Sequence, residues 1–286
     1  MSSIKLAVRG ASRGRQIDGF VFDMDGTLVL GDRDNQGLKP LPGAKNMLRF
    51  LRQRDIPFVV FTNGTPRPPQ SYAEKLRGAG FELEDKQMLT PASSAADLFL
   101  RKGYRKVMVM GGEGLSKPLN DVGIEAVPAE KGQRNVDAVF IGWFREFGLG
   151  HHEAACEAVW NGATVYSASQ VLFFATANGR QLGSSRAISA MLKDATGCRI
   201  NVVGKPSRAA ITHASNRLGV KASHLAVVGD DPDLEVRMAH NAKGVAVAVY
   251  SGLATPDVFD TWPKALHPHL GLAGVKELLQ LCKQAI

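Results

Sequence analysis

The chain has 286 residues, 44% of them hydrophobic, which suits one large or two modest globular domains. No stretch approaches the roughly 20 apolar residues of a membrane span, so no membrane partner is expected. The formal net charge is +8, but the basic residues are scattered and only 7% of residues are aromatic, so no nucleic-acid partner is expected and the charge is compatible with an anionic small molecule.

Residues 1–16 contain four basic residues and no acidic one, and they lack the continuous apolar core of a secretory signal. We expect this segment to be a flexible tail.

The three cysteines, Cys156, Cys198 and Cys282, are far apart and form no CxxC pair, so neither a zinc ribbon nor a disulfide framework is expected. A reducing compartment follows, and we expect a cytoplasmic protein, with organelle targeting left open.

Further along the chain, short apolar runs alternate with longer helical patterns, which is typical of a parallel sheet with crossover helices. Ser71 and Ser207 are suited to cap two of the helices. The expected strands are residues 19–22, 57–61, 200–203, 225–228 and 245–249. The expected helices are residues 43–54, 71–79, 184–195, 207–218, 233–241 and 274–283.

A second group of strands and helices falls between about residues 88 and 180. The expected strands are 106–110, 124–127, 138–141 and 163–166, with helices at 92–101 and 151–160. We predict a separate α/β unit inserted into the first one. The inserted unit is predicted at 88–182, and the first unit is predicted to consist of the two flanking segments, 1–87 and 183–286.

The first chemical motif is Asp23-Met24-Asp25-Gly26-Thr27, directly after the apolar strand 19–22. Side chains two positions apart on an extended chain point the same way, so Asp23 and Asp25 are expected to face a common point. Two carboxylates held together favour a divalent metal and phosphoryl chemistry. A turn or calcium loop is the alternative, but the twelfth position of such a loop would be Asp34 rather than Glu.

Three further motifs also follow apolar runs. Thr62-Asn63-Gly64 offers a hydroxyl and a turn, Lys205 offers a positive charge before Pro206, and Asp230 begins a cluster of acidic residues. Taken alone, Lys205 is equally well explained as a solvated loop residue. In a parallel sheet the carboxyl ends of the strands meet at one edge, so we expect all four motifs to converge there and to hold a metal and an anion beside a nucleophile.

Two pairs of histidines are not expected to bind metal. His151 and His152 diverge on a helix, and His267 and His269 flank Pro268 without another ligand nearby. The Gly-rich run 111–114 lacks the Rossmann spacing, so a tight turn is expected there.

With these four motifs in this order, the chain resembles the haloacid dehalogenase superfamily of aspartate-dependent phosphatases from about residue 17 onward. It is most similar to class IIA, the NagD-like and p-nitrophenylphosphatase-like enzymes. The class-specific likeness rests on Thr62-Asn63-Gly64, on the segment 72–76 with Gly80-Phe81, and on Gly204-Lys205-Pro206-Ser207. The resemblance implies a doubly wound parallel-sheet α/β core with an inserted C2-type α/β cap, and a dimer paired through the cap.

The resemblance also implies residue roles. Asp23 would be the nucleophile that forms an aspartyl-phosphate, and Asp25 the general acid and base. Mg²⁺ would be held by Asp23, the backbone carbonyl of Asp25, and Asp230, an oxygen-only set that suits this ion. Thr62 and the amide of Asn63 would bind phosphoryl oxygens, and Lys205 would neutralise charge on the nucleophile and phosphate.

The sequence departs from the class pattern in three places. Glu235 stands where a second Asp is usual, so it would act on the metal through water, or Asp231 would replace it. The segment 174–179 lacks the acid that usually follows an Ala-Thr-Asn run, and the run 141–145, which contains Trp143 and Arg145, lacks the acidic residue that is usual there. Trp143 and Arg145 are candidate substrate contacts of the cap, and cap packing is their alternative role.

The predicted function is a Mg²⁺-dependent phosphomonoesterase acting on a small phosphorylated metabolite. A phosphomutase of the same superfamily is one alternative, although only about thirty residues separate Leu28 from Thr62, too few for a folded cap at that point. A non-catalytic protein that binds a phosphometabolite is the other.

Overall fold

The computed structural model describes residues 3–31, 37–176 and 179–285. The chain forms two compact units. The core unit contains the chain up to Thr62, Ala73–Leu89 and the chain from Ala214 onward, and the insert unit contains Asn63–Tyr72 and Thr90–His213. The predicted boundaries at 88 and 182 stay a prediction.

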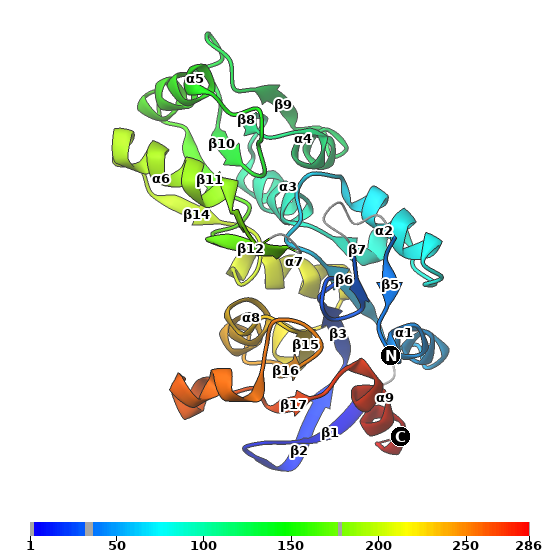
Figure 1. Cartoon of the computed structure of the whole chain (residues 1–286). Coiled ribbons are helices and arrows are strands. Elements are labelled where there is room, and N and C mark those ends of the chain that lie inside the picture. Colours follow the sequence, from blue (N-terminus) through cyan, green and yellow to red (C-terminus); the bar gives the residue numbers. More distant parts are fainter. Residues whose placement is uncertain (1–2, 32–36, 177–178, 286) are drawn as a thin grey trace. The chain divides into compact units, whose positions relative to one another are not determined.

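The core unit is built on a six-stranded parallel sheet (Figure 1). Its strands, in spatial order, are β17 (Leu270–Leu272), β16 (Val245–Val249), β15 (Leu225–Gly229), β3 (Gly19–Phe22), β6 (Phe58–Phe61) and β7 (Met88–Leu89). The chain adds strands on one side of β3 and later on the other side. The order therefore reverses between β3 and β15, and ligands of such sheets bind beyond the strand ends at that point.

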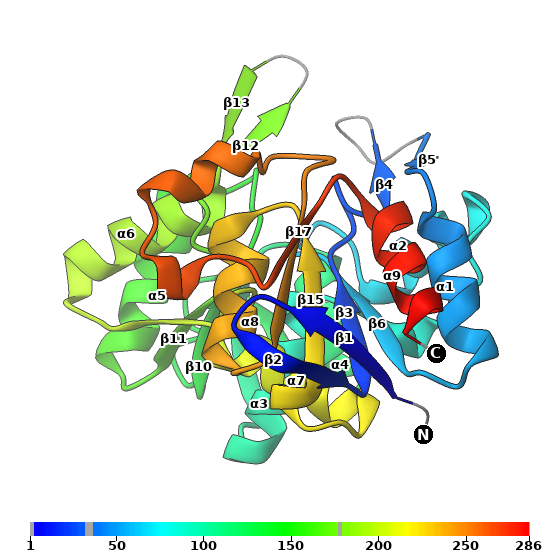
Figure 2. The ribbon, with the colours of Figure 1, turned by 90° about the horizontal axis from the view of Figure 1, so that it is seen from below.

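Helices cover both faces of this sheet (Figure 2). On one face α1 (Ala44–Gln53) packs against α9 (Val275–Gln284). On the other face α8 (Arg237–Asn241) packs on β15 and β16 (Figure 2). In α1 the buried residues Ala44, Met47, Leu48 and Leu51 recur at the helical spacing that creates one apolar stripe. The strands between these layers are continuous apolar runs, as expected for a sheet buried on both faces.

The N-terminal segment is a β-hairpin, so the predicted flexible tail is wrong. Strands β1 (Ile4–Val8) and β2 (Ala11–Ile17) pair antiparallel. Ile4 and Leu6 are buried while Lys5 is exposed, because alternate residues of a strand face opposite sides. This alternation is visible in the sequence but is short and interrupted by basic residues. The hairpin packs against α9, at the blue and red ends of the chain in Figure 1.

The insert unit has its own five-stranded parallel sheet. Its strands, in spatial order, are β14 (Ile200–Val202), β11 (Thr164–Ser167), β10 (Ala138–Ile141), β8 (Lys106–Met110) and β9 (Glu125–Pro128). Alternate residues of β8 enter different cores. Val107 and Val109 join the cluster around Phe99, whereas Met108 and Met110 join the cluster around Ile188. The sheet is thus covered on both faces, and the predicted α/β fold is confirmed.

One strand lies in a different sheet from the one we expected. We expect the strand at 200–203 in the same sheet as β3, but β14 pairs with β11 of the insert unit. Hydrophobicity marks a segment as a strand without specifying its neighbour, because the pairing depends on tertiary packing.

The remaining elements include several that the sequence did not reveal. Ser207 caps the helix α7 (Arg208–Leu218) as expected, because its hydroxyl accepts from the Ala210 N–H at 3.1 Å. Ser71 does not cap a helix but lies inside α2 (Pro69–Gly78). A helix, α4 (Glu113–Asn120), begins within the run 111–114, where a tight turn was expected.

The other α-helices are α3 (Pro91–Lys102), α5 (Leu149–Trp160) and α6 (Ser184–Thr196). The short strands are β4 (Val29–Leu30), β5 (Lys39–Pro40), β12 (Phe173–Thr176) and β13 (Gly179–Leu182). The short helical turns are η1 (Asp85–Gln87), η2 (Ala222–His224), η3 (Pro232–Val236), η4 (Pro256–Thr261) and η5 (Lys264–Leu266). Among the described residues, none of the helices has the length and apolarity needed to cross a bilayer.

Candidate active site

Asp23 and Asp230 follow adjacent strands at the reversal point of the core sheet. β3 and β15 pair in register through Phe22 and Val228, and the Asp23 N–H donates to the Val228 carbonyl at 2.8 Å. Asp23 is therefore one residue after Phe22 on the β3 side, and Asp230 is two residues after Val228 on the β15 side. Neighbouring parallel strands are about 4.8 Å apart, so the sheet brings these two carboxylates to one place. Both side chains are buried, with 9% of Asp23 and 5% of Asp230 exposed.

The loop after Asp23 differs from the extended chain that we expected. β3 ends at Phe22, and the chain then folds back so that the Leu28 and Val29 N–H groups both donate to the Met24 carbonyl. Asp25 lies on this loop and is exposed, whereas Asp23 is buried. Strand alternation therefore does not apply to this pair. The two carboxylates differ in their contact with water, which suits one to attack and the other to exchange protons.

Asp230 is held by groups from two loops of the core unit. One carboxylate oxygen accepts from the Leu253 N–H at 2.8 Å, and the other accepts from the Thr27 hydroxyl at 3.5 Å. Gly26 and Gly252 approach so closely that a Cβ on either would overlap the Asp230 carboxylate. These contacts fix the position of Asp230 beside the loop that carries Asp25.

Glu235 and Asp231 organise the segment after Asp230. Glu235 is 1% exposed, its side chain lies against Gly229, and its carboxylate accepts from the Asp231 N–H at 3.2 Å. The Asp231 carboxylate accepts from the Asp233 N–H at 2.9 Å and so caps η3. Glu235 thus packs beneath the loop that carries Asp230.

Thr62 follows β6, on the other side of β3 from β15. Its N–H donates to the Leu89 carbonyl at 3.2 Å, and its side chain is 5% exposed. Three of the predicted site residues, Asp23, Thr62 and Asp230, therefore follow the carboxyl ends of three successive strands, as predicted for this edge of the sheet.

In the insert unit, Asn63 and Lys205 form a paired arrangement. The Asn63 side chain accepts from the Lys205 N–H at 2.9 Å and donates to the Lys205 carbonyl at 3.1 Å. Gly204 lies against the same Asn63 oxygen, where a Cβ would be crowded. Lys205 is only 2% exposed, which rules out the solvated loop lysine considered from the sequence. A cation this deeply buried needs polar or anionic partners.

The candidate cap contacts lie on the loop after β10. Trp143 is half-buried and its N–H donates to the Thr65 hydroxyl at 2.9 Å, whereas Arg145 is exposed. The loop is therefore attached to the segment that begins at Asn63. In the segment 174–179, Ala177 and Asn178 lie outside the described residues.

Two family models match the chain. One, described as haloacid dehalogenase-like hydrolase, matches residues 20–125, and a second model of the same kind of hydrolase matches residues 202–278. These segments contain all four motifs. The chain belongs to the haloacid dehalogenase-like hydrolases.

Known relatives of this hydrolase agree with that placement. An acid sugar phosphatase from Staphylococcus aureus is 27% identical over 242 residues, covering 84% of this chain and 89% of the relative. The structure of NagD from E. coli matches with a TM-score of 0.79 and 25% identity, covering 91% of this chain and 98% of that one. A glycerol phosphate phosphatase from Mycobacterium tuberculosis, solved in complex with calcium, matches with a TM-score of 0.78 and 27% identity, covering 91% and 74%. The predicted class IIA likeness is confirmed.

The donor set of this hydrolase suits a hard divalent cation. Among the described residues, no group of three His, Cys, Asp or Glu side chains is arranged to hold a metal. The predicted set needs only two, because its third protein ligand is the Asp25 backbone carbonyl. Carboxylate and carbonyl oxygens are the donors that Mg²⁺ and Ca²⁺ prefer. The burial of Asp23 and Asp230 on adjacent strands fits such an ion, since two close carboxylates repel each other without a cation.

Several supporting residues were not predicted from the sequence. The loop after β16 holds Asp230 through the Leu253 N–H, and the Ser251 hydroxyl donates to the Gly26 carbonyl at 2.7 Å. The available signal was Ser251-Gly252 directly after the apolar run 245–249, because a polar turn at a strand end marks the functional edge of a parallel sheet.

Proposed function

We propose that this hydrolase is a divalent-metal-dependent phosphomonoesterase that acts on a small phosphorylated metabolite through an aspartyl-phosphate. The proposal is carried by one observation: the buried carboxylates of Asp23 and Asp230 follow adjacent strands at the reversal point of the core sheet. That arrangement joins a nucleophile to an acidic cation site at the edge where such sheets bind ligands.

In the first half-reaction a carboxylate oxygen of Asp23 attacks the phosphorus atom of the substrate. An O–P bond to Asp23 forms as the bond between phosphorus and the leaving oxygen breaks. Asp25, on the exposed loop, donates its proton to that oxygen, so the product leaves as a neutral alcohol.

In the second half-reaction Asp25 accepts a proton from water. The water oxygen bonds to phosphorus, the bond to Asp23 breaks, and inorganic phosphate leaves. Asp25 needs access to water for this step, which agrees with its exposure. Both half-reactions together consume one water and return the enzyme to its starting protonation state.

The divalent ion would be held by the carboxylates of Asp23 and Asp230 and the backbone carbonyl of Asp25, and it would supply positive charge to stabilise the phosphoryl oxygens. Mg²⁺ is the proposed ion. Thr62 would donate a hydrogen bond to a phosphoryl oxygen. We propose that Lys205 neutralises the same group, and that the Asn63 side chain positions Lys205 by binding its backbone.

The proposed substrate is a phosphorylated alcohol of metabolite size. The relatives named as acid sugar phosphatase and glycerol phosphate phosphatase support this class. Trp143 and Arg145 stay candidate substrate contacts, and a dimer paired through the cap stays a prediction. Release of phosphate from a panel of sugar phosphates, glycerol phosphates, phosphoglycolate, nucleotides and pyridoxal phosphate would identify the preferred leaving group.

The test of the reaction type is turnover of p-nitrophenyl phosphate with Mg²⁺, repeated with EDTA and with Asp23→Asn. We expect EDTA to abolish turnover, Mg²⁺ to restore it, and Asp23→Asn to lower kcat by at least about 10³-fold. Asp233→Asn is the matched control, because Asp233 lies three residues from Asp230 but is exposed and paired with Arg237 at 2.6 Å. Turnover that survives both EDTA and Asp23→Asn would reject the mechanism.

A further inference from the structure

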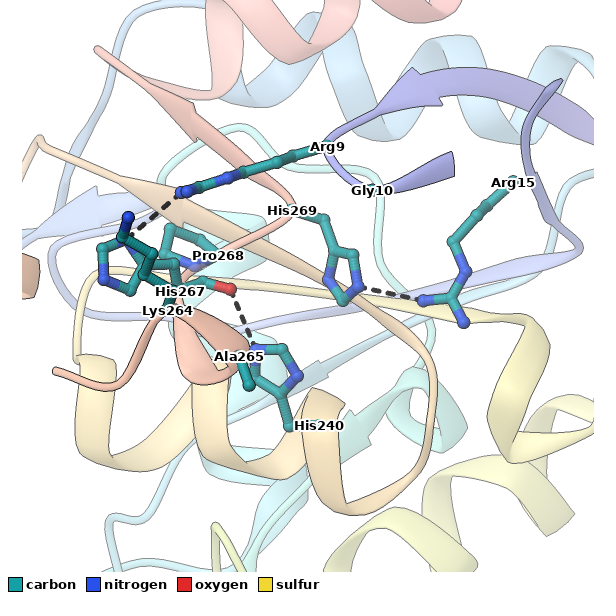
Figure 3. Close-up of a pocket in the computed structure, with 9 residues that line it drawn as sticks. All are labelled: Arg9, Gly10, Arg15, His240, Lys264, Ala265, His267, Pro268 and His269. Carbon is teal, nitrogen blue, oxygen red and sulfur yellow. Dashed lines mark hydrogen bonds between the residues drawn. The ribbon is translucent and has the colours of Figure 1, made fainter. Parts of the chain in front are cut away.

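A cavity of the core unit, apart from the candidate active site, is lined by basic side chains (Figure 3). We call it the amino-edge pocket. Its volume is about 340 Å³, which is within the range of small-molecule sites. Its polar lining consists of Arg9, Arg15, His240, Lys264, His267 and His269. None of the residues that line it is acidic.

The pocket lies at the opposite edge of the core sheet from Asp23 and Asp230. His269 directly precedes β17, and the Arg15 guanidinium donates to the carbonyls of Lys243 and Gly244, directly before β16. Because the strands are parallel, this is the edge where they begin. A five-residue strand spans about 16 Å, so the pocket is separated from the carboxyl-edge site by the length of the strands.

The positive charge in the pocket is not balanced by carboxylates. Among residues 3–31, 37–176 and 179–285, no Asp or Glu forms an ion pair with Arg9, Arg15 or Lys264. The Arg15 guanidinium donates to two carbonyls, and one of its nitrogens lies 3.0 Å from the Nε2 atom of His269, so all of these neighbours are neutral groups. Burial foremost, and then the charge of Arg15, lowers the pKa of His269 to about 4, so this ring is neutral near pH 7 and adds no positive charge of its own to the pocket.

Hydrogen bonds and ring stacking order Arg9 and the histidines of the pocket before any ligand arrives. Arg9 is hydrogen-bonded to His267 Nδ1 at 3.2 Å, and His240 Nε2 lies 3.0 Å from the His267 carbonyl. The rings of His240 and His269 stack with their centroids 5.1 Å apart. Figure 3 shows Arg9 and Arg15 entering from the N-terminal hairpin on either side of His269. Such prior ordering lowers the conformational entropy that these side chains lose when a ligand binds.

We propose that the amino-edge pocket binds the phosphoryl group of a small anion, as a site separate from the carboxyl-edge active site. Guanidinium groups match phosphoryl oxygens in geometry as well as charge, and the unbalanced cluster of Arg9, Arg15 and Lys264 supplies the attraction. The ligand is either inorganic phosphate or the phosphoryl end of an organic phosphate. This proposal is independent of the proposed reaction, because it rests on none of the residues proposed to take part in that reaction.

The test is an NMR titration of the full-length protein at pH 7, observing the Cε1–H signals of His240, His267 and His269. The probes are inorganic phosphate and phenylphosphonate, whose carbon–phosphorus bond a phosphomonoesterase does not cleave. We expect saturable shifts of these signals with a dissociation constant on the order of 1 mM. Tighter binding of phenylphosphonate would identify an organic phosphate as the ligand, and equal binding would show that the pocket recognises the phosphoryl group alone.

Charge variants locate the binding. Arg9→Gln and Lys264→Gln should each weaken it by about fivefold, because each removes a cation from the pocket while leaving the Arg15 contacts to the β16 entry intact. Lys5→Gln is the control: it removes the same charge from the same hairpin, but Lys5 is exposed and does not line the pocket. Circular dichroism spectra would verify that each variant folds.

Three results would overturn the proposal. The first is no saturable shift at about 20 mM phosphate, roughly twenty times the expected dissociation constant. The second is an equal shift with sodium chloride at the same ionic strength, which would indicate general screening. The third is equal weakening by Lys5→Gln and Arg9→Gln, which would indicate diffuse attraction to the charged surface.

Discussion

Gly26 and Asp230 lie so close together that no side chain could be placed between them. A Cβ on Gly26 would overlap the Asp230 carboxylate, and the Gly26 backbone has φ of +79°, in the region that favours glycine. The loop after β3 and the loop after β15 therefore fit against each other only with glycine at this position.

We expect Gly26→Ala to lower kcat by about 100-fold or more, because Asp230 must move away from the proposed cation site. Gly123→Ala is the matched control, since Gly123 has φ of +81° but nothing within 4 Å of its Cβ position. Both variants should lose about 1 kcal/mol of stability from the backbone conformation, and only Gly26→Ala should lose activity. Thermal unfolding and p-nitrophenyl phosphate kinetics measure the two effects, and equal activity in both variants would contradict the interpretation.

Asn63→Ala removes both hydrogen bonds to the Lys205 backbone. If Asn63 positions Lys205, kcat should fall by roughly tenfold to 100-fold. Asn63→Asp keeps the acceptor for the Lys205 N–H and should lose less. Asn120→Ala is the control, because Asn120 makes a similar side-chain bond to the Ala126 N–H at 3.0 Å in the same unit. Full activity in Asn63→Ala with unchanged folding would remove Asn63 from the proposed mechanism.

Two substitutions of Glu235 separate the effect of its negative charge on Mg²⁺ from the effect of its packing on stability. Glu235→Gln keeps the shape and an acceptor for the Asp231 N–H, so its unfolding free energy should stay near that of the wild type. If the negative charge supports the cation, the Mg²⁺ concentration for half-maximal activity should rise several-fold. Glu235→Ala leaves a void beside Gly229 and should cost about 2 kcal/mol. An unchanged Mg²⁺ requirement in Glu235→Gln would make Glu235 a packing residue alone.

His269 should make the stability depend on pH. Its pKa is about 4 in the folded protein, because of burial and the neighbouring Arg15, against 6.5 for an ordinary histidine. The unfolded chain thus binds the proton more readily, so the stabilisation is complete above about pH 6.5 and is lost as the pH falls toward 4. Because the ring is partly exposed, we expect a loss on the order of 1 kcal/mol.

Denaturant unfolding from pH 7 to pH 4 measures this dependence. His269→Asn cannot titrate there, so the difference in unfolding free energy between wild type and variant should shrink as the pH falls. A difference that stays constant over this range would show that His269 does not titrate differently in the folded and unfolded states.

Most helices and the central strands could be predicted from the sequence, because their apolar residues repeat at regular spacing. The N-terminal hairpin was missed because its alternation of Ile4 and Leu6 with charged residues is short. The placement of β14 was wrong because an apolar run does not specify which sheet it joins. The roles of Leu253 and Ser251 were missed because these residues act through a backbone N–H and a single hydroxyl, which leave little trace in composition.

The sequence by itself determined the family and the chemical character of the site. Each motif is a short run of residues that can be recognised without knowing the fold: paired aspartates, a hydroxyl, a lysine and a later aspartate, each after an apolar run. Only the tertiary structure decided which groups support one another. Asp23 and Asp230 are 207 positions apart and become neighbours through strand pairing, and the burial of Lys205 depends on packing around it. Likewise, Arg9, Arg15 and His269 form one cavity because the hairpin folds onto the start of β16 and β17, a long-range contact that no local pattern specifies.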